Sequence, residues 1–308
     1  MKPAVQLPDH NLHESPHTRG ITIHGWTINA TTKPISSASE LDALQSSLGG
    51  LPLPEMTFGS NALELVHGPS GWKYVFETEG ALRGVKNGEL GEGDGGVKVG
   101  YADEWLKSRT VPDSSIPLPK TEPTKPYDWT YTTTYAGRSD SEEPATEWLP
   151  QDPMTSNYGI PIAELTRPDP ILFYAEIPLY EDELHDNGAS SYLVRIRVMP
   201  TCIFILARAT LRVDNVLFRV HDTRIYHSFA SAPPAIVRET SGWEAPYAHV
   251  AQRLPKRDDK TPLTDPNFIG KVLADMPKES TQIAGAGTKW RGLGTKLEVA
   301  MLPQSQSS

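Results

Sequence analysis

The feature that most constrains the fold is a long stretch of alternating apolar and arginine residues between positions 191 and 221. β-branched residues recur there at every second position, which is typical of strands. We therefore expect three strands at 191–199, 202–213 and 216–221, arranged as an antiparallel meander. Pro200-Thr201 forms the first turn, and Asp214-Asn215 has the chemistry of a two-residue hairpin loop.

These turns predict which residues lie opposite one another. The first turn pairs Val198 with Ile203, and the second pairs Val213 with Val216 and Thr210 with Arg219. Cross-strand partners share a face, so one face is entirely apolar and forms the core, because a slip by one residue buries arginines. The members of this face are Val194, Ile196, Val198, Ile203, Ile205, Ala207, Ala209, Leu211, Val213, Val216, Phe218 and Val220.

The opposite face interleaves five arginines with apolar groups. It is expected to hold Leu193, Arg195, Arg197, Phe204, Leu206, Arg208, Thr210, Arg212, Leu217, Arg219 and His221. It could be a solvated outer surface. It could instead bind an acidic or C-terminal peptide, because arginine pairs bidentately with carboxylates and stacks on aromatic rings. A third interpretation is that a helix or second sheet covers it, with acidic residues at 181–186 neutralising the arginines.

Several other elements are expected along the chain. Ser37 and Glu40 have capping-box spacing before a leucine stripe that ends at Gly49, which predicts a helix. Pro266 opens a second helix. Strands are expected at 21–28, 72–76 and 127–135, where aromatic or β-branched residues alternate.

The domain plan follows from these elements. We predict an α+β fold of mainly antiparallel, sandwich-like β sheets with a few short helices in a single compact domain at 21–274. The polar segments 1–20 and 275–308 are expected to be disordered. An acidic, proline-bearing insertion at 139–159 is expected to be exposed, and the glycine-rich stretch 88–96 is expected to be a loop.

Charge and cysteine content exclude several classes of protein. The 308 residues carry a net charge of −9, which argues against binding nucleic acid through its phosphates. One cysteine, Cys202, permits no intrachain disulfide and fits a reducing compartment. Neither a secretory signal nor an apolar run long enough for a membrane span is evident. The sequence indicates a cytoplasmic protein that could also be nuclear, with no membrane partner.

One cluster suggests metal chemistry. Residues 181–186 combine four carboxylates with His185, and His221-Asp222 could add ligands, so a metal-dependent hydrolase around His185, Asp186, His221 and Asp222 is the alternative function. Six consecutive positions cannot all converge on one ion, and the run also fits a charged loop ending at Asn187-Gly188. Nothing in the sequence activates Cys202 as a nucleophile. We therefore predict no catalytic residue, metal or cofactor.

Six long strings, taken together, resemble the signature of the TIPRL family of TOR-signalling pathway regulators. In chain order they lie at 53–59, 125–133, 181–188, 194–200, 211–214 and 221–227. The resemblance implies non-enzymatic regulators that bind the catalytic subunits of type 2A, 4 and 6 phosphatases. It also implies a compact antiparallel β fold with helices and a cleft for the C-terminal tail of the phosphatase.

The resemblance also suggests contact positions and partners. It places Ile160, Val220 and Asp222 near positions that family members use for contact. The arginine face adds Arg195, Arg197, Arg208, Arg212 and Arg219 as candidates, and Arg224 is a further candidate. The resemblance implies that, in fungi, such proteins act in TOR signalling by opposing or tuning the association of the phosphatase with its other TOR-regulated subunit. That subunit is a further candidate partner. The insertion and tail would suit a filamentous-fungal member. If the chain is instead a scaffold for several signalling proteins, these two segments carry the binding.

Overall fold

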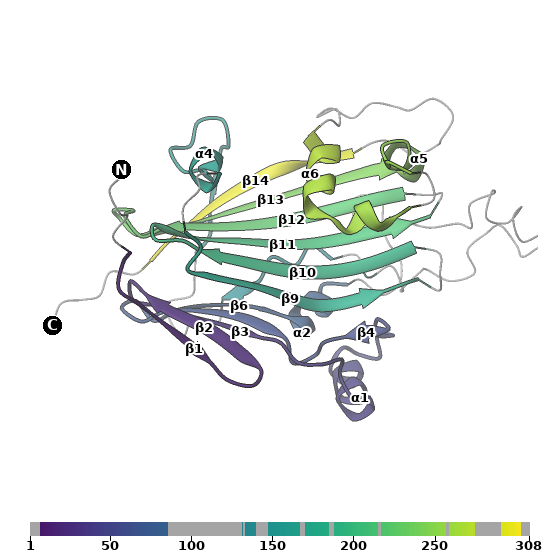
Figure 1. Ribbon diagram of the computed structural model, residues 1–308, viewed down its shortest axis with the longest axis horizontal. Coiled ribbons are helices and arrows are strands. Elements are labelled where there is room, and N and C mark those ends of the chain that lie inside the picture. Colours follow the sequence, from purple (N-terminus) through teal and green to yellow (C-terminus); the bar gives the residue numbers. More distant parts are fainter. Residues whose placement is uncertain are drawn as a thin grey trace, which may run out of the picture.

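Two antiparallel sheets packed face to face make up the structure (Figure 1). The computed structural model describes residues 7–85, 131, 133–139, 147–166, 170–184, 188–214, 217–256, 259–274 and 291–302. The predicted class, mainly antiparallel sheets with a few short helices in one compact domain, is confirmed.

The small sheet has six strands in the order β1-β2-β3-β5-β6-β7. They are β1 (His10–Glu14), β2 (Thr18–Ile23), β3 (Trp26–Thr31), β5 (Ala62–His67), β6 (Trp72–Glu77) and β7 (Arg138–Ser139). The single strand expected at 21–28 is wrong, because a hairpin divides it. His24 and Gly25 both have positive φ, at 48° and 80°, which is the backbone of a tight two-residue turn. The strand expected at 72–76 is confirmed as β6.

The large sheet has eight strands in the order β4-β9-β10-β11-β12-β13-β14-β8. They are β4 (Met56–Thr57), β8 (Leu149–Gln151), β9 (Phe173–Asp182), β10 (Gly188–Val198), β11 (Cys202–Val213), β12 (Leu217–Ser228), β13 (Ala235–Pro246) and β14 (Arg291–Met301). Its centre is the predicted meander, with β12 extending beyond the expected end at 221.

The helices are short. They are α1 (Ala38–Ser47), α2 (Thr78–Arg83), α4 (Ile162–Leu165), α5 (Tyr247–Ala251), the 3-10 helix η2 (Thr261–Thr264) and α6 (Pro266–Ala274). The two predicted helices are confirmed as α1 and α6. At the start of α1, the backbone N–H of Ser37 donates to the carboxylate of Glu40 at 2.7 Å, as a capping box requires. Among the described residues, no helix has the length and apolar character needed to cross a membrane.

The main core fills the space between the sheets. Val194, Ile196 and Val198 of β10 point into it and are at most 1% exposed. They meet the inward side chains of the small sheet, including Trp26 and Phe76. This burial of apolar surface is the dominant favourable contribution to the fold.

A tyrosine-bound strap lies between the sheets where a strand was expected. Its described part, 131 and 133–137, is not a strand, and Tyr131 has a positive φ of 45°. The side-chain hydroxyls of Tyr180 and Tyr192 donate to the carbonyls of Tyr131 and Tyr135, both at 2.7 Å. The hydroxyl of Tyr74 donates to the Ala136 carbonyl at 2.6 Å. These hydroxyls satisfy backbone carbonyls of the strap that would otherwise accept hydrogen bonds from the N–H groups of a neighbouring strand.

The expectation of disordered ends is wrong for two segments. Residues 10–20 contribute β1 and part of β2, and residues 291–301 form β14, an interior strand of the large sheet. Part of the insertion expected at 139–159 also joins the sheet, since Leu149–Gln151 pairs with β14. Polar composition misled for β14 and β8 because their strand partners are distant in the sequence. β1 is instead the mostly exposed outer arm of a hairpin with the adjacent β2, and its polar side chains reflect that exposure. The expected loop 88–96 lies outside the described residues.

The register of the meander is confirmed at the first turn and wrong at the second. Val198 lies opposite Ile203, as predicted. Val213 lies opposite Leu217 and not Val216, so three residues connect β11 and β12 where two were expected. One residue of slip exchanges the two faces of a strand. Phe218 and Val220 therefore lie on the arginine face, and Arg219 and His221 lie on the inner face.

Candidate functional site

The outer face of the large sheet carries a charged band that we call the arginine strip. It consists of Glu176 on β9, Arg195 and Arg197 on β10, Arg208 on β11, Asp222 and Arg224 on β12, and Glu239 on β13. The register brings them together, because Arg195 lies opposite Glu176, Arg208 opposite Asp222, and Arg224 opposite Glu239. Residues from five strands, far apart in the sequence, thus form one surface.

The centre of the strip is a buried bidentate ion pair. Nε and Nη2 of Arg208 donate to the two carboxylate oxygens of Asp222 at 2.6 and 2.8 Å. The two side chains are 8% and 3% exposed. Such parallel bonds fix the guanidinium in one plane, and the low local dielectric strengthens them. Nη1 of Arg208 is buried and has no hydrogen-bond partner among the described residues.

Arg224 extends this pair into a network across β12 and β13. Its Nη2 donates to Asp222 at 3.0 Å, and its Nη1 donates to Glu239 at 2.6 Å. Asp222 therefore bridges two arginines, and Arg224 bridges two carboxylates. Breaking one member of such a network leaves its partners as buried charges without compensation.

At the β9 side of the strip, Arg195 pairs with Glu176. Its Nε donates to the Glu176 carboxylate at 2.9 Å, and the Tyr174 hydroxyl donates to the same carboxylate. The hydrogen bond from Tyr174, followed by the bond and charge of Arg195, holds the pKa of Glu176 below its usual value despite partial burial. Glu176 therefore stays ionised at neutral pH and keeps Arg195 paired.

Two apolar clusters flank the strip. Along β12, the outward side chains run from Phe218 and Val220 through Asp222 and Arg224 to Tyr226. Phe218 and Val220 pack beneath α5, η2 and α6. Tyr226 belongs to a cluster with Val237 and Val299, against which Tyr158, Ile160 and Leu165 pack. Figure 1 shows α4 near one end of these strands and α5 and α6 near the other.

Arg212 lies on the same face, beyond the strip. Its Nε is 2.9 Å from the carboxylate of Asp214, and its Nη2 donates to the Gly188 carbonyl at 3.2 Å. Lys260 also pairs with Asp214 and ties the segment before η2 to the end of β11. Arg212 therefore supports the local turn and is separated from the strip by Thr210.

Predicted site residues divide between the two faces. Arg195, Arg197, Arg208, Arg212, Val220, Asp222 and Arg224 lie on the outer face, where Ile160 packs beside the strip. Arg219 does not. It is buried on the inner face because of the register difference. The contribution of each residue to partner binding stays a prediction, and Val220 is only 1% exposed beneath the helices.

The inner face has a small pocket. Arg219 and His221 line it together with Tyr131, Thr133, Ser190 and neighbours on β11. Its volume is about 10 Å³, which accommodates about one water molecule. Burial lowers the pKa of His221, which favours a neutral imidazole there. The pocket is too small for a substrate of ordinary size.

His221 and Asp222, the second ligand cluster of the metal-dependent hydrolase alternative, do not lie together. His221 faces the inner pocket, whereas Asp222, the next residue on the strand, faces outward and is bonded to two arginines. Adjacent residues of a strand point to opposite faces, so the two cannot share an ion. Within the described residues, no group of three candidate metal ligands occurs. His185 and Asp186 lie outside the described part of the chain.

The acids that neutralise the arginines are not those expected. Asp182, in the acidic run 181–186, accepts bonds from the backbone N–H groups of Glu55 and Leu184 and stabilises a loop. Glu176 and Glu239 neutralise arginines of the strip instead, and neither residue was predicted to do so. Their alternation with apolar residues in β9 and β13 was a usable signal, because it places a charged group on the outward side of each strand. The interpretation that a helix covers the arginine face is correct at the end of this face that holds Phe218, where α5 and α6 lie over it.

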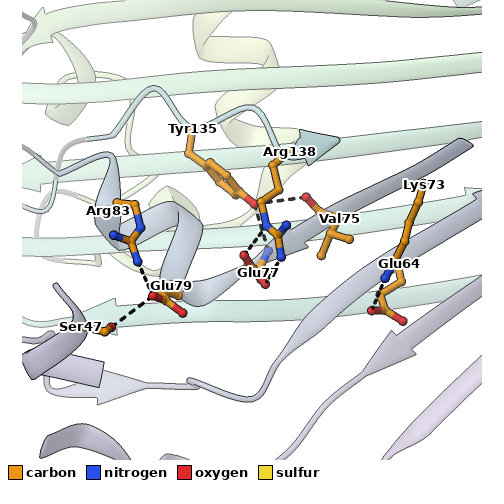
Figure 2. Close-up of polar contacts among 9 residues, drawn as sticks. All are labelled: Ser47, Glu64, Lys73, Val75, Glu77, Glu79, Arg83, Tyr135 and Arg138. Atoms are coloured by element: carbon orange, nitrogen blue, oxygen red, sulfur yellow. Dashed lines mark hydrogen bonds and ion pairs between the residues drawn. The ribbon is translucent and has the colours of Figure 1, made fainter. Parts of the chain in front are cut away.

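The small sheet provides a contrasting surface. Figure 2 shows ion pairs of this sheet and of the adjoining helix α2: Arg83 contacts Glu79 on α2, and Arg138 of β7 contacts Glu77 of β6. Lys73 lies 3.9 Å from Glu64. Arg83 is 61% exposed and its partner Glu79 is 42% exposed. Pairs of this kind are solvated and contribute little to stability.

Comparisons with known proteins identify relatives over most of the chain. Residues 56–251 match the profile of the TIP41-like family. A rat "TIP41-like protein" is 38% identical over 248 residues, covering 80% of this chain and 83% of the relative. A Saccharomyces cerevisiae "Type 2A phosphatase activator TIP41" is 35% identical over 287 residues, covering 87% and 74%. The Schizosaccharomyces pombe protein with the corresponding name is 33% identical over 246 residues, covering 79% and 88%.

Proposed function

The chain belongs to the TIP41-like family, and from this premise we propose that it is a non-enzymatic regulator that binds the catalytic subunit of type 2A protein phosphatases. Two fungal relatives are named as type 2A phosphatase activators, which supports a phosphatase-regulating role. Both matches extend over more than three quarters of this chain. They therefore include the residues that build the arginine strip.

The structural observation that supports this proposal is the concentration of arginines on one face of an acidic protein. The net charge is −9, yet the strip contains four arginines and three carboxylates. Arginine recognises carboxylates through paired N–H donors, and the flanking apolar clusters suit adjacent side chains of a peptide. The C-terminal tail of the phosphatase, with its free carboxylate, is the segment we place there.

The finer parts of the proposal concern the cellular setting. The regulator acts in TOR signalling in the cytoplasm, with the nucleus as a second candidate compartment. It tunes the association of the phosphatase with the other TOR-regulated subunit that binds it. Regulation by binding requires no catalytic residue in this chain. The effect on phosphatase activity follows because the regulator covers the C-terminal tail of the phosphatase and the phosphatase surfaces around that tail.

Binding of the purified chain to a purified type 2A catalytic subunit tests the proposal. Isothermal titration should give a saturable 1:1 complex. Arg195→Glu alters the strip at a pair whose acidic partner is nearly half exposed, so the fold should tolerate it better than a change at Arg208. We expect this variant to bind at least about ten-fold more weakly, because it introduces repulsion to an incoming carboxylate.

Arg138→Glu on the small sheet is the matched control, since it reverses the charge of another paired surface arginine. It should bind as the unaltered chain does. Absence of any complex with the unaltered chain would overturn the proposed function. Equal loss in both variants, or in neither, would overturn the assignment of the strip as the binding surface.

A further inference from the structure

The charges of the arginine strip do not balance, and the excess is located at one residue. Glu176 pairs with Arg195, Asp222 pairs with Arg208 and Arg224, and Glu239 pairs with Arg224. Each carboxylate is thus engaged. Arg197 is the arginine of the strip for which the described residues provide no carboxylate partner, and its Nε is buried without a hydrogen bond to any of them. Partial burial leaves this donor poorly compensated.

The neighbours of Arg197 make its position suitable for recognition. Tyr174 lies opposite it on β9, and Phe204 lies opposite it on β11, so an aromatic side chain flanks it on each side. Tyr174 is 41% exposed and therefore accessible to a partner. Aromatic neighbours lower the local dielectric, which strengthens pairing between a guanidinium and an incoming anion.

We infer that Arg197 is the anchor for a carboxylate of an acidic partner peptide, with Tyr174 contacting an apolar side chain beside that carboxylate. The argument for an acidic peptide is charge complementarity, since Arg197 carries the excess positive charge of the strip. The inference rests on the proposed function, in which the peptide belongs to the phosphatase catalytic subunit. It assigns the anchoring contact to the β9 side of the strip and leaves a positioning role to the Arg208–Asp222 pair.

Within the described part of the chain Arg197 has no ion pair to lose, which makes the inference separable from stability. Arg197→Gln should leave the urea midpoint close to that of the unaltered chain, yet weaken binding to the purified catalytic subunit roughly ten-fold or more. The salt dependence of binding should also become shallower, because one charge pair is removed. Arg197→Lys keeps the charge without the planar fork and should bind with intermediate affinity.

Arg83→Gln on α2 is the matched control and should preserve both affinity and salt dependence. If Arg197→Gln binds as tightly as the unaltered chain, with the same salt dependence, the anchor assignment is wrong and the proposed function stands. If the unaltered chain itself forms no complex, the proposed function fails first. Binding of Arg197→Lys as weak as that of Arg197→Gln would still support an anchor that needs the bidentate fork.

Discussion

The outer face of the large sheet and the surface around the small sheet both carry arginine–carboxylate ion pairs, but the two sets differ in how deeply they are buried. Arg208 and Asp222 on the large sheet are 8% and 3% exposed, whereas Arg83 and Glu79 on α2, the helix that follows β6 of the small sheet, are 61% and 42% exposed. Bidentate geometry and a bridging second arginine connect the first pair to a network. The second pair is a local contact one helical turn apart on α2.

This difference shows that the charge of a side chain does not decide its role. Solvent screens the exposed pairs of the small sheet, so they mainly keep that surface soluble. Neighbouring strands and flanking clusters desolvate the arginines of the large sheet, so their positions are fixed. A fixed arginine can recognise a carboxylate without losing much side-chain freedom on binding.

The largest effect is expected for Asp222→Asn. The substitution keeps the size of the side chain but leaves buried Arg208 without a counter-charge, so the free energy of unfolding should fall by about 3–5 kcal/mol. Urea denaturation followed by circular dichroism measures this. Glu79→Gln on α2 is the control and should change it by less than about 0.5 kcal/mol. Similar midpoints for the two variants would show that the depth of the pair is unimportant.

The next effect concerns Val220, which is buried beneath α5 and α6. Val220→Ala should lower the free energy of unfolding by about 2 kcal/mol, because two methyl groups lose apolar contacts. Ile162→Ala on α4 is the matched control, since Ile162 is exposed, and it should have little effect. Any loss of phosphatase binding by Val220→Ala should therefore follow the loss of fold. Weaker binding at unchanged stability would instead make Val220 a direct contact.

A pH effect is expected where the two sheets meet. His227 of the large sheet and His67 of the small sheet both pack against Trp26, with ring centroids 4.9 and 4.8 Å away. Burial lowers the pKa of both imidazoles. The unfolded chain therefore takes up protons below about pH 6.5 that the folded chain does not, and stability falls as the pH decreases. The slope should reach at most about 1.4 kcal/mol per pH unit for each histidine.

Thermal unfolding between pH 7.5 and 5.5 measures this slope. His227→Gln removes one of the two buried imidazoles and should make the slope shallower. A substitution at exposed His249 controls for the loss of a histidine as such. A slope that is unchanged by His227→Gln would mean that protonation of His227 does not contribute to the pH dependence of stability.

The smallest effect is expected for Arg83→Ala. Arg83 forms an exposed ion pair with Glu79 on α2, so the free energy of unfolding should change by no more than about 0.5 kcal/mol. Differential scanning calorimetry should detect almost no shift. A loss comparable to that of Asp222→Asn would remove the distinction between the two surfaces.

Much of the fold could be predicted because its signals are local. The alternation in β10 and β11 assigned their faces correctly, and the capping box at Ser37 located α1. The strap at 131–137 could not be predicted, because tyrosine hydroxyls from both sheets replace the strand partners that its alternation implied. The end strand β14 was missed for a related reason, since its partners β13 and β8 are far away in the sequence. β1 was missed because it is a mostly exposed, polar arm of a hairpin with β2.

The candidate site was predicted in part. Arg195, Arg197, Arg208 and Arg212 share the outer face, as the alternation requires. Arg219 and Val220 exchange faces relative to expectation, because β12 has apolar residues on both sides and its pattern alone permits either register. The register of β12 is decided by the helices that cover this face, since α5 and α6 bury Phe218 and Val220.

The sequence by itself determined the strands of the meander, the inward side of its first two strands and the presence of an arginine-bearing face. These depend on the two-residue period of a strand, which every side chain along it reports. Only the tertiary structure decided the three-residue connection to β12, the carboxylate partners Glu176 and Glu239, and the residue left with excess charge, Arg197. Pairing across strands depends on which segments meet in space, and no local pattern encodes that choice.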